Sequence, residues 1–500
     1  MKVCFLVDNL YSPRYGIQLL SSELKARGFA VQLYAYSEPG FIENIQTDKP
    51  DVIAYSCMSG EYNLLFEINK RLKEKISFLS VWGGPHPTFF TDIIFHENID
   101  AICTGEGDHV FANMVEKLKN NSDYKTTPNF YFKGDNGQIV KNPHSKLLDI
   151  DSLELPDFEI FELEGKELLT VFLSRGCPFN CTYCFNHKWK DIHADDIYSK
   201  KLRTMSVPFV RELFIKKIKP IIEKYGMKYV HFDDDVFPYG REWLENFSKM
   251  YGAEIGVPFD INLHPLMVKD SNIKLLKKVG LFRVNIAIES GSTAIRKQVL
   301  NRNMTNEQIL EAAKIIKGNG LLLHTQNITC LPRETWEDTK KTLELNIKCK
   351  SDISVVSKFV PYPGTRLASI AMEEGYLSEG FEKILPDNYH WTSILHFKNK
   401  KDKQKMEYLV NLFTLCVFYP FLKPLVYFLV TLPPWRILKR IYARIDNQVW
   451  ILVTQKNYHS QINSKKIKTF FLILFRLIFP ESKKRTLKRR LFYLSDESFK

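Results

Sequence analysis

The 500-residue chain lacks several features that would assign it to a class at once. Residues 1–8 form a short apolar run that soon reaches an acid, without a hydrophobic region and a cleavage site, so we expect no secretory signal peptide. Most of the 9 cysteines are scattered without the spacing of a disulfide framework, which indicates a reducing, cytoplasmic location. No base-reading motif accompanies the positive charge, so no nucleic-acid partner is expected.

The chain also lacks a clean membrane-spanning segment. Residues 413–432 are nearly all apolar and close to the length that a spanning helix needs, but Pro420, Lys423 and Pro424 interrupt them. Residues 470–480 are apolar but too short to span, and they include Arg476.

Excess charge of one sign is absent from the first 400 residues, which carry 50 Lys and Arg against 51 Asp and Glu. Residues 401–500 carry 20 against 6, so the net charge of +13 belongs to this last part. Apolar stretches flanked by cations are typical of a surface that lies on an anionic bilayer, and we expect peripheral contact with the inner face of a membrane. The alternative is a helical region that packs its apolar faces on the rest of the protein and keeps a solvated basic rim.

The most informative feature that is present is a group of three cysteines. Cys177, Cys181 and Cys184 have the spacing C-x3-C-x2-C and follow an apolar strand-like run at 168–173. Three thiolates this close can hold three irons of a [4Fe-4S] cube and leave the fourth iron open to a second molecule. A zinc site is disfavoured because no second Cys/His pair follows, and three ordinary buried cysteines would rarely cluster by chance.

Short apolar strands alternate with amphipathic helices over residues 1–120, which predicts a doubly wound parallel sheet. Strands are expected at 3–7, 30–35, 50–56, 78–82 and 99–103, and a hairpin at 129–141. The turns Gly83-Gly84-Pro85 and Gly105-Glu106-Gly107 fall at the carboxyl ends of strands, where such sheets bind ligands.

Six further strand–helix units follow, which predicts a partial barrel with its chemistry at the carboxyl ends of the strands. Its strands are expected at 169–174, 228–233, 257–263, 281–288, 321–329 and 353–360. The remaining C-terminal region is basic and rich in apolar residues, and we expect it to be mainly helical. The domains we expect are 1–145, a linker at 146–167, 168–375, and 376–500.

The motifs together resemble a known family. Residues 168–375 look like a radical S-adenosylmethionine (SAM) core, a partial (βα)6 TIM-like barrel, and residues 1–145 look like the Rossmann-like cobalamin-binding domain that often precedes it. The cysteine motif, with Tyr183 before its third cysteine, is the specific part. The other matching segments are Gly83-Gly84-Pro85-His86-Pro87-Thr88, Gly105-Glu106-Gly107-Asp108, Phe232-Asp233-Asp234-Asp235-Val236-Phe237, Glu289-Ser290-Gly291-Ser292 and Tyr362-Pro363-Gly364-Thr365.

The resemblance implies three cofactors and a set of residues for each. Cys177, Cys181 and Cys184 would hold the [4Fe-4S] cluster as its metal ligands. The residues implied for SAM are Tyr183, Asp234, Glu289, Ser290 and Arg302. Those implied for cobalamin are Ser56, Gly83, Gly84 and Gly105. Residues Asp233, Asp234 and Asp235 could also form a divalent-metal site, but a cluster enzyme already accounts for them.

The chain departs from the family pattern at two places. Residues 327–334 resemble the family's G-L-P-G-E stretch, but Cys330 and Arg333 replace both glycines, which puts an adenine contact there in doubt. The turn at 8–13 has no histidine where some cobalamin domains carry D-x-H-x-x-G, so cobalt would receive no histidine ligand from this loop.

The family resemblance implies an enzyme that cleaves SAM to a 5′-deoxyadenosyl radical, with an electron donor such as flavodoxin or ferredoxin. The reaction we favour is cobalamin-dependent methyl transfer to an unactivated carbon of a hydrophobic or natural-product substrate. The alternatives are a cobalamin-dependent oxidative cyclisation or rearrangement and, in another class, a non-catalytic cobalamin or redox sensor.

Overall fold

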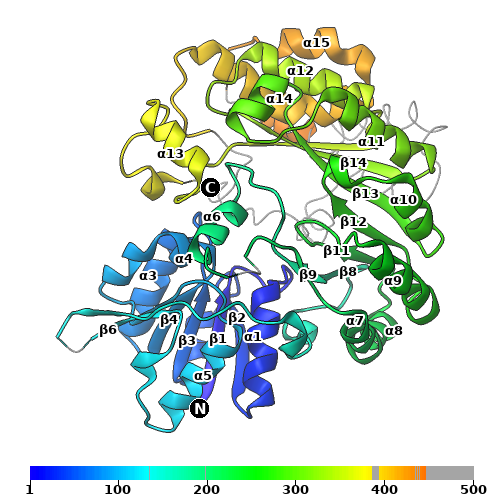
Figure 1. The fold of residues 1–500 in the computed structure, drawn as a ribbon. Helices are drawn as coiled ribbons and strands as arrows, with labels where there is room; N and C mark the ends of the chain where they lie inside the picture. Colours follow the sequence, from blue (N-terminus) through cyan, green and yellow to red (C-terminus); the bar gives the residue numbers. More distant parts are fainter. Residues whose placement is uncertain are drawn as a thin grey trace.

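A computed structural model describes residues 1–445, apart from residues 135, 197, 198, 386–392, 434, 436 and 439. The fold contains two parallel sheets that face each other across a junction, followed by a group of helices (Figure 1). The apolar run at 470–480 and the basic residues at 465–490 lie outside the described residues.

The amino-terminal sheet has seven strands in the order β2-β1-β3-β4-β5-β6-β7. The bounds are β1 Lys2–Val7, β2 Ala30–Ala35, β3 Val52–Ser56, β4 Leu79–Gly83, β5 Ala101–Cys103, β6 Phe130–Lys133 and β7 Ile139–Lys141. The first five strands are parallel, and the expected hairpin β6–β7 adds two antiparallel strands beside β5. Strand order reverses on either side of β1, as in a doubly wound sheet, so the expectation is confirmed.

Alternate residues of β1 point to opposite faces of this sheet, and both faces are buried. Val3 and Phe5 belong to one apolar core, whereas Cys4 and Leu6 belong to another. A strand covered on both faces has to be apolar throughout, which explains the unbroken run in the sequence. The helices of this unit are α1 Tyr15–Ala26, α2 Phe41–Asp48, α3 Tyr62–Lys73, α4 Pro85–Phe89 and α5 Asp108–Lys119.

The second sheet is an all-parallel half-barrel of six strands in the order β15-β14-β13-β12-β11-β8. Its strands are β8 Leu168–Val171, β11 Tyr229–Phe232, β12 Phe259–Leu263, β13 Leu281–Glu289, β14 Leu322–Thr329 and β15 Ile353–Lys358. The helices on its outer face are α7 Val207–Leu213, α8 Lys219–Tyr225, α9 Arg241–Glu254, α10 Asp270–Lys277, α11 Asn306–Gly318 and α12 Trp336–Lys348 (Figure 1). All six strands lie where the sequence predicts them.

The C-terminal helices are α13 Arg366–Glu373, α14 Lys400–Phe418 and α15 Lys423–Leu429, with the 3₁₀ helix η9 Pro420–Leu422 between the last two. Helix α14 packs against β15 and α12, and Phe413 and Cys416 are fully buried there. This packing favours the second interpretation of the apolar run for its first part. No helix in the described part of the chain is both long and apolar enough to cross a bilayer.

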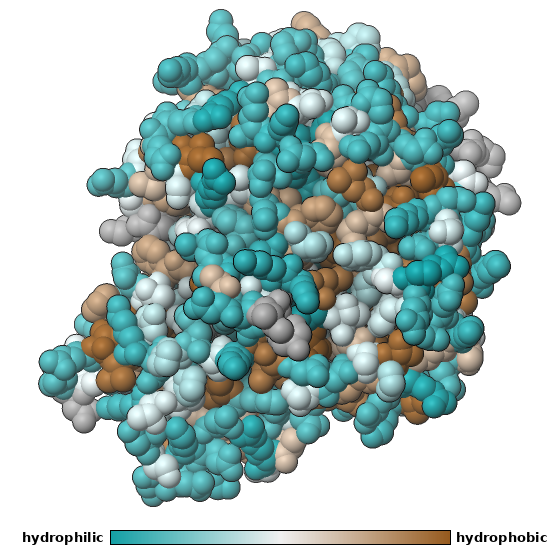
Figure 2. Space-filling model, in the orientation of Figure 1, coloured by the Kyte–Doolittle hydropathy of each residue, from teal (hydrophilic) through white to brown (hydrophobic). Residues whose placement is uncertain are grey.

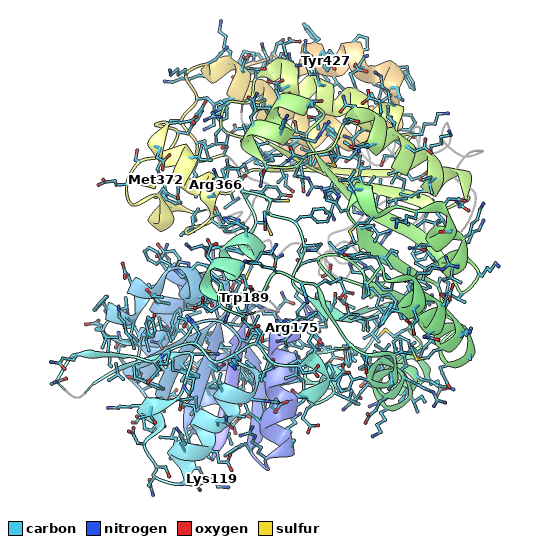
Figure 3. All side chains as sticks on the ribbon, viewed as in Figure 1. Lys119, Arg175, Trp189, Arg366, Met372 and Tyr427 are labelled. Atoms are coloured by element: carbon cyan, nitrogen blue, oxygen red, sulfur yellow. The ribbon has the colours of Figure 1, made fainter. Side chains whose placement is uncertain are left out.

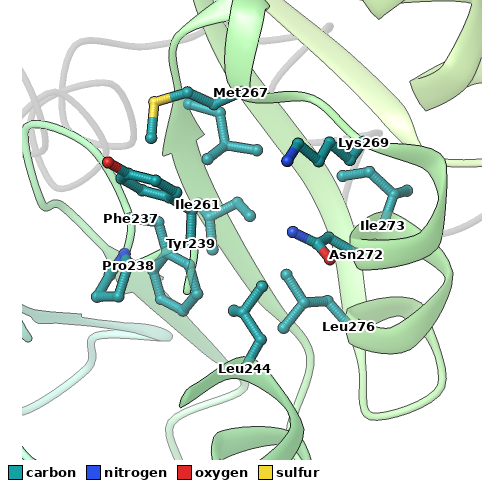
Figure 4. Close-up of a pocket in the computed structure, with 11 residues that line it drawn as sticks. Phe237, Pro238, Tyr239, Leu244, Ile261, Met267, Lys269, Asn272, Ile273 and Leu276 are labelled. Atoms are coloured by element: carbon teal, nitrogen blue, oxygen red, sulfur yellow. The ribbon is translucent and has the colours of Figure 1, made fainter. Parts of the chain in front are cut away.

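A small cavity of about 10 Å³ lies on the helix-covered face of β12, lined by Leu244, Ile261, Leu276 and neighbouring side chains (Figure 4). Its volume is on the order of a single water molecule, so it cannot hold a substrate. The visible surface is mostly hydrophilic, with apolar side chains gathered in separate patches (Figure 2).

Candidate functional site

The three cysteines of the motif lie on the loop between β9 Ser174–Arg175 and α6 Phe185–Ile192, at the carboxyl end of the half-barrel. Gly176 opens this loop with φ +85°, and a Cβ there would approach the Lys201 carbonyl to 3.3 Å, so the turn needs glycine. The Thr182 hydroxyl donates to the Val299 carbonyl at 2.6 Å, which fixes the middle of the loop to the barrel.

Burial raises the pKa of Cys177 to about 11 and that of Cys184 to about 12. Both groups are therefore neutral thiols near neutral pH, and they must release protons to bind a metal. No set of three His, Cys, Asp or Glu side chains in the described part of the chain converges on a single metal position. Such convergence is not needed for a [4Fe-4S] cube, in which each thiolate binds a different iron.

Four of the predicted residues form one contact network beside the loop. Arg302 approaches Cys181 Sγ at 3.3 Å and the Tyr183 hydroxyl at 3.4 Å. The Tyr183 hydroxyl donates to Glu289 Oε1 at 2.5 Å. Burial raises the pKa of Glu289, although the Arg302 charge opposes this shift. Arg302 is buried, and its Nε lacks a hydrogen-bond partner among the described residues, which leaves a donor for a ligand.

Glu289 ends β13 with φ +67°, a left-handed conformation that is costly for a non-glycine residue. The next residue, Ser290, is fully buried and its hydroxyl accepts from Ser292 N at 3.2 Å, so it stabilises the turn. Gly291 follows, where a Cβ would come within 2.2 Å of the Lys341 carbonyl on α12. This turn aims Glu289 toward the cysteine loop and Ser290 into the protein interior.

Asp234 also turns inward. Its Oδ1 accepts from Leu173 N at 2.9 Å and from the Ser174 hydroxyl at 2.5 Å, which joins the ends of two strands. Burial raises the pKa of Asp234 to about 7, and its Oδ2 has no partner among the described residues. Asp235, which the sequence suggested only as part of a possible divalent-metal site, acts electrostatically on both Cys177 and Cys184 and adds to the rise that burial causes in their pKa values.

A second site is defined by the carboxyl edge of the amino-terminal sheet. Ser56 and Gly83 are register partners at the ends of β3 and β4. Gly84 has φ +96°, and a Cβ there would come within 3.1 Å of the Cys57 backbone. Gly105 has φ +90° and lies against the imidazoles of His144 and His193. The close approach of the Cys57 backbone therefore requires glycine at position 84, and Gly105 packs against two imidazoles at the same edge.

The loop after β1 supplies an arginine to this edge. Arg14 donates to the Ser56 carbonyl at 2.5 Å and pairs with Glu61 at 2.6 Å and Asp8 at 3.3 Å. The guanidinium is thus held by two carboxylates and one carbonyl at the ends of β1 and β3.

The two sites are joined by contacts that sequence reasoning missed. Arg175, two residues before Cys177, donates to both oxygens of Asp108 at 2.7 and 2.9 Å and pairs with Glu106 at 3.1 Å. Arg203 also pairs with Glu106. Figure 3 shows Arg175 at the junction of the two sheets. The signal in the sequence was the position of the charges: Arg175 lies two residues before the cysteine motif, and Glu106 and Asp108 lie in the Gly105-Glu106-Gly107-Asp108 segment.

An aromatic contact completes the junction. The rings of Phe89 and Phe185 stack with centroids 4.6 Å apart, and Phe185 is 5.2 Å from Tyr362. Gly364 has φ +83°, and a Cβ there would meet Phe89 Cβ at 3.2 Å. The Tyr362-Pro363-Gly364-Thr365 segment therefore packs against the amino-terminal unit and the cysteine loop together.

Two protein-family models match the chain. Residues 1–115 match the B12 binding domain model, and residues 171–345 match the radical SAM superfamily model. The chain belongs to the cobalamin-dependent radical SAM enzymes. Its cofactors are a [4Fe-4S] cluster with SAM, and cobalamin.

The enzyme is similar to several curated proteins. An uncharacterized methyltransferase of Pyrococcus horikoshii is 28% identical over 343 residues, covering 66% of this chain and 71% of that protein. The anaerobic magnesium-protoporphyrin IX monomethyl ester cyclase of Rubrivivax gelatinosus is 24% identical, covering 73% and 68%. Among solved structures, the cobalamin-dependent radical SAM enzyme OxsB with aqua-cobalamin aligns with a TM-score of 0.68 at 16% identity, covering 98% of this chain and 83% of that chain. The methyltransferase TsrM of Kitasatospora setae aligns with a TM-score of 0.60 at 13% identity and covers 76% of each chain.

Proposed function

We propose that this enzyme transfers a methyl group from cobalamin to an unactivated carbon of its substrate. The observation that carries the proposal is the loop after β1, which places Arg14, and no histidine, beside Ser56. A cobalamin held at this edge would receive no imidazole from this loop, and it would supply the methyl group. The relatives named as methyltransferases, including that of Pyrococcus horikoshii, support the same choice.

The residues of the first site have distinct roles in this proposal. Cys177, Cys181 and Cys184 each hold one iron of the cluster. Arg302 pairs with the carboxylate of SAM, since its Nε is a buried donor without a partner among the described residues. Glu289, oriented by Tyr183, accepts hydrogen bonds from SAM. Asp234 and Ser290 hold the two strand ends in place beneath it.

When bound, the cluster and cobalamin supply one electron for SAM cleavage to the 5′-deoxyadenosyl radical and a methyl group for transfer. The electron comes from a reductant, for which we propose flavodoxin or ferredoxin. Ser56, Gly83, Gly84 and Gly105 bind cobalamin along the sheet edge. The junction residues Arg175, Glu106 and Asp108 hold the two cofactor sites at a fixed separation.

Anaerobic reconstitution with iron, sulfide and cobalamin tests the proposal. With SAM and a reductant, we expect 5′-deoxyadenosine, and we expect a product that is heavier than its substrate by one methyl group. Cys181→Ser should abolish the electron paramagnetic resonance signal of the reduced cube, whereas Cys349→Ser, at a buried cysteine outside the motif, should keep it. A cluster signal that is equal in both variants would refute the assignment of ligands.

The second candidate is an oxidative cyclisation, favoured by the similarity to the cyclase of Rubrivivax gelatinosus. The same assay separates the two reactions, because a cyclase forms 5′-deoxyadenosine while its product gains no methyl group. A protein that binds both cofactors and forms no 5′-deoxyadenosine would instead act as a sensor.

We also propose that the region around α15 touches an anionic membrane and brings the enzyme to a substrate with an apolar portion. Phe421 of η9 and Phe428 of α15 are 69% and 60% exposed, and Leu425 of α15 is exposed as well. Exposed aromatic side chains in a segment that is followed along the chain by cations such as Arg440 are typical of interfacial segments.

A further inference from the structure

The concave face of the half-barrel, which faces away from the outer helices, carries a polar cluster that none of the cofactors explains. Alternate residues of each strand point to opposite faces of the sheet. On the helix-covered face, Val230, Ile261, Val284 and Leu323 form the apolar core. The other face carries His231 on β11, Asp260 and Asn262 on β12, Arg283 and Asn285 on β13, and His324 and Gln326 on β14, with Asp233 just after β11.

All of these side chains except Gln326 belong to one hydrogen-bonded layer. Asp260 Oδ2 accepts from Arg283 at 2.9 Å and from Asn285 at 2.8 Å, and it lies 2.9 Å from His231 Nδ1. Asn285 Oδ1 is 3.0 Å from His324 Nδ1. Apolar side chains of similar volume could fill the same space and would give a fold at least as stable, so the polar layer is not needed for stability.

The layer carries no net charge. Asp260 and Asp233 are balanced by Arg283 and His231, since burial would lower the pKa of His231 but the two carboxylates raise it to about 10. Burial lowers the pKa of His324 to about 3, so this imidazole is neutral. A phosphate or carboxylate would meet Asp233 unfavourably, and a cation would meet Arg283 unfavourably, so the layer fits an uncharged ligand.

Part of the layer is exposed to solvent, and some of its hydrogen-bonding atoms have no partner among the described residues. The Asp233 side chain is 47% exposed, and Gln326 is exposed with no hydrogen bond to any described residue. Asp260 Oδ1 and His324 Nε2 are buried without a partner among the described residues. Buried polar atoms of this kind cost roughly 1–3 kcal/mol each unless a water or a ligand satisfies them.

The open part lies next to the SAM-binding residues. Gln326 is the register partner of Ala287, two residues before Glu289 on β13, which is about 7 Å along the strand. Val355, the register partner of Gln326 on β15, is apolar, so the polar groups are concentrated over β11–β14. A ligand on this layer would hold its carbons beside the place where SAM is cleaved.

We propose that the concave face of the half-barrel binds an uncharged, hydroxyl-rich portion of the substrate, such as a sugar or polyol ring, through Asp233, Asn262 and Gln326. This inference rests on the proposed function and names the chemistry of the substrate portion that reacts. An apolar portion of the same molecule can still lie toward β15 and the C-terminal helices.

Deuterium transfer tests the inference in the reconstituted holoenzyme. We would offer perdeuterated glucose, glucose 6-phosphate and cyclohexanol separately, with SAM and dithionite. One C–D bond of the occupant breaks and one C–D bond forms at the 5′ carbon, so the mass of 5′-deoxyadenosine reports which probe occupies the barrel. Dithionite supplies the electron that cleaves SAM, and a further electron and a proton quench the carbon radical.

We expect label from glucose, and less from glucose 6-phosphate or cyclohexanol. Gln326→Leu should lower the label from glucose about fivefold, the worth of one hydrogen bond, while unlabelled 5′-deoxyadenosine still forms. Gln138→Leu, at an exposed glutamine in the hairpin turn, should leave the label unchanged. Saturation-transfer NMR of glucose with the unreduced holoenzyme should show the same loss in Gln326→Leu alone.

The outcomes separate the two proposals. Absence of 5′-deoxyadenosine with every probe would refute the proposed function. 5′-Deoxyadenosine that carries as much label from cyclohexanol as from glucose, or label from no probe, would overturn the hydroxyl-rich substrate while leaving the radical chemistry intact. Preference for glucose 6-phosphate would overturn the requirement for an uncharged ligand.

Discussion

Gly291 is the residue at which a single added carbon is least tolerated. A Cβ there would lie 2.2 Å from the Lys341 carbonyl, which belongs to the backbone of α12 and cannot move aside easily. We expect Gly291→Ala to lower the free energy of unfolding by about 3 kcal/mol, since overpacking of this kind forces backbone shifts. Urea unfolding under anaerobic conditions measures it.

Gly318 is the matched control, because it ends α11 and has nothing within 4 Å of its Cβ position. Gly318→Ala should be neutral or stabilising by about 0.5 kcal/mol, through lower backbone entropy of the unfolded chain. Equal stabilities for the two variants would contradict the close approach of the Gly291 turn to α12.

The buried pair of His231 and Asp260 should make stability depend on pH. Burial would lower the pKa of His231, but Asp260 and Asp233 raise it from 6.5 to about 10. A raised pKa stabilises the fold fully below the unfolded value of 6.5, and this contribution disappears as the pH rises toward 10. His231→Gln should therefore lose on the order of 3 kcal/mol near pH 6 and much less above about pH 9.

Unfolding curves of the wild type and His231→Gln at the two pH values check this prediction. Asp260 keeps Arg283 and Asn285 as partners in the variant, so its carboxylate remains paired. A difference in stability that stays constant with pH would mean that the imidazole is uncharged in the native protein.

At the residue scale, the sequence predicted part of the candidate site. Cys181, Tyr183, Glu289 and Arg302 do meet, because each follows a strand or a motif whose position the fold class determines. The inward direction of Ser290 was not predictable, since it depends on the left-handed turn at Glu289. That turn is set by the approach of α12, a tertiary contact without a local signal.

Secondary-structure elements were the most predictable level of the molecule. Buried strands such as β1 and β13 are long apolar runs between turn residues, and each lies within about two residues of its expected position. The stretch at 327–334 shows the limit. Cys330 and Arg333 adopt φ +60° and +63°, so the chain keeps a glycine-type backbone without its glycines. Arg333 pairs with Glu374 and its N–H donates to the Tyr376 hydroxyl at 2.9 Å, contacts that help to hold this conformation.

Helix α15 carries a prediction of its own. If the exposed aromatic side chains of η9 and α15 lie on a membrane, Phe421→Ser combined with Phe428→Ser should lower the partition of the enzyme onto anionic vesicles by about a hundredfold or more, since each buried aromatic contributes about 1.5–3 kcal/mol. Flotation in a density gradient without detergent measures this partition.

Leu266→Ser is the control, because Leu266 is 42% exposed on the half-barrel, far along the chain from α15. It should float like the wild type. Flotation that is unchanged in the double variant, or lost equally in the control, would remove the membrane proposal.

For the whole molecule, Arg175 makes the bidentate ion pair that links the two halves. Arg175→Met would leave the buried Asp108 carboxylate without its bidentate partner, at a cost of about 3–5 kcal/mol. We expect a lower melting temperature and faster proteolysis of the region between the two sheets. Cobalamin affinity, followed by visible absorption, should fall as well, because Asp108 and Glu106 adjoin Gly105.

Lys25→Met is the matched control for this prediction. Lys25 pairs with Asp157 at 2.6 Å but is 46% exposed, so its loss should change stability by less than about 1 kcal/mol. An Arg175→Met protein that melts like Lys25→Met would show that the two halves are held together by other contacts.

The hairpin that extends the amino-terminal sheet has a practical consequence. Its outermost strand, β7, has only 3 residues, and its last residue is the exposed Lys141. An edge strand this short and charged exposes few unpaired backbone N–H and C=O groups to a second molecule. A longer edge strand would favour strand pairing between molecules. In preparations concentrated enough for spectroscopy, we therefore expect no strand pairing between molecules through β7.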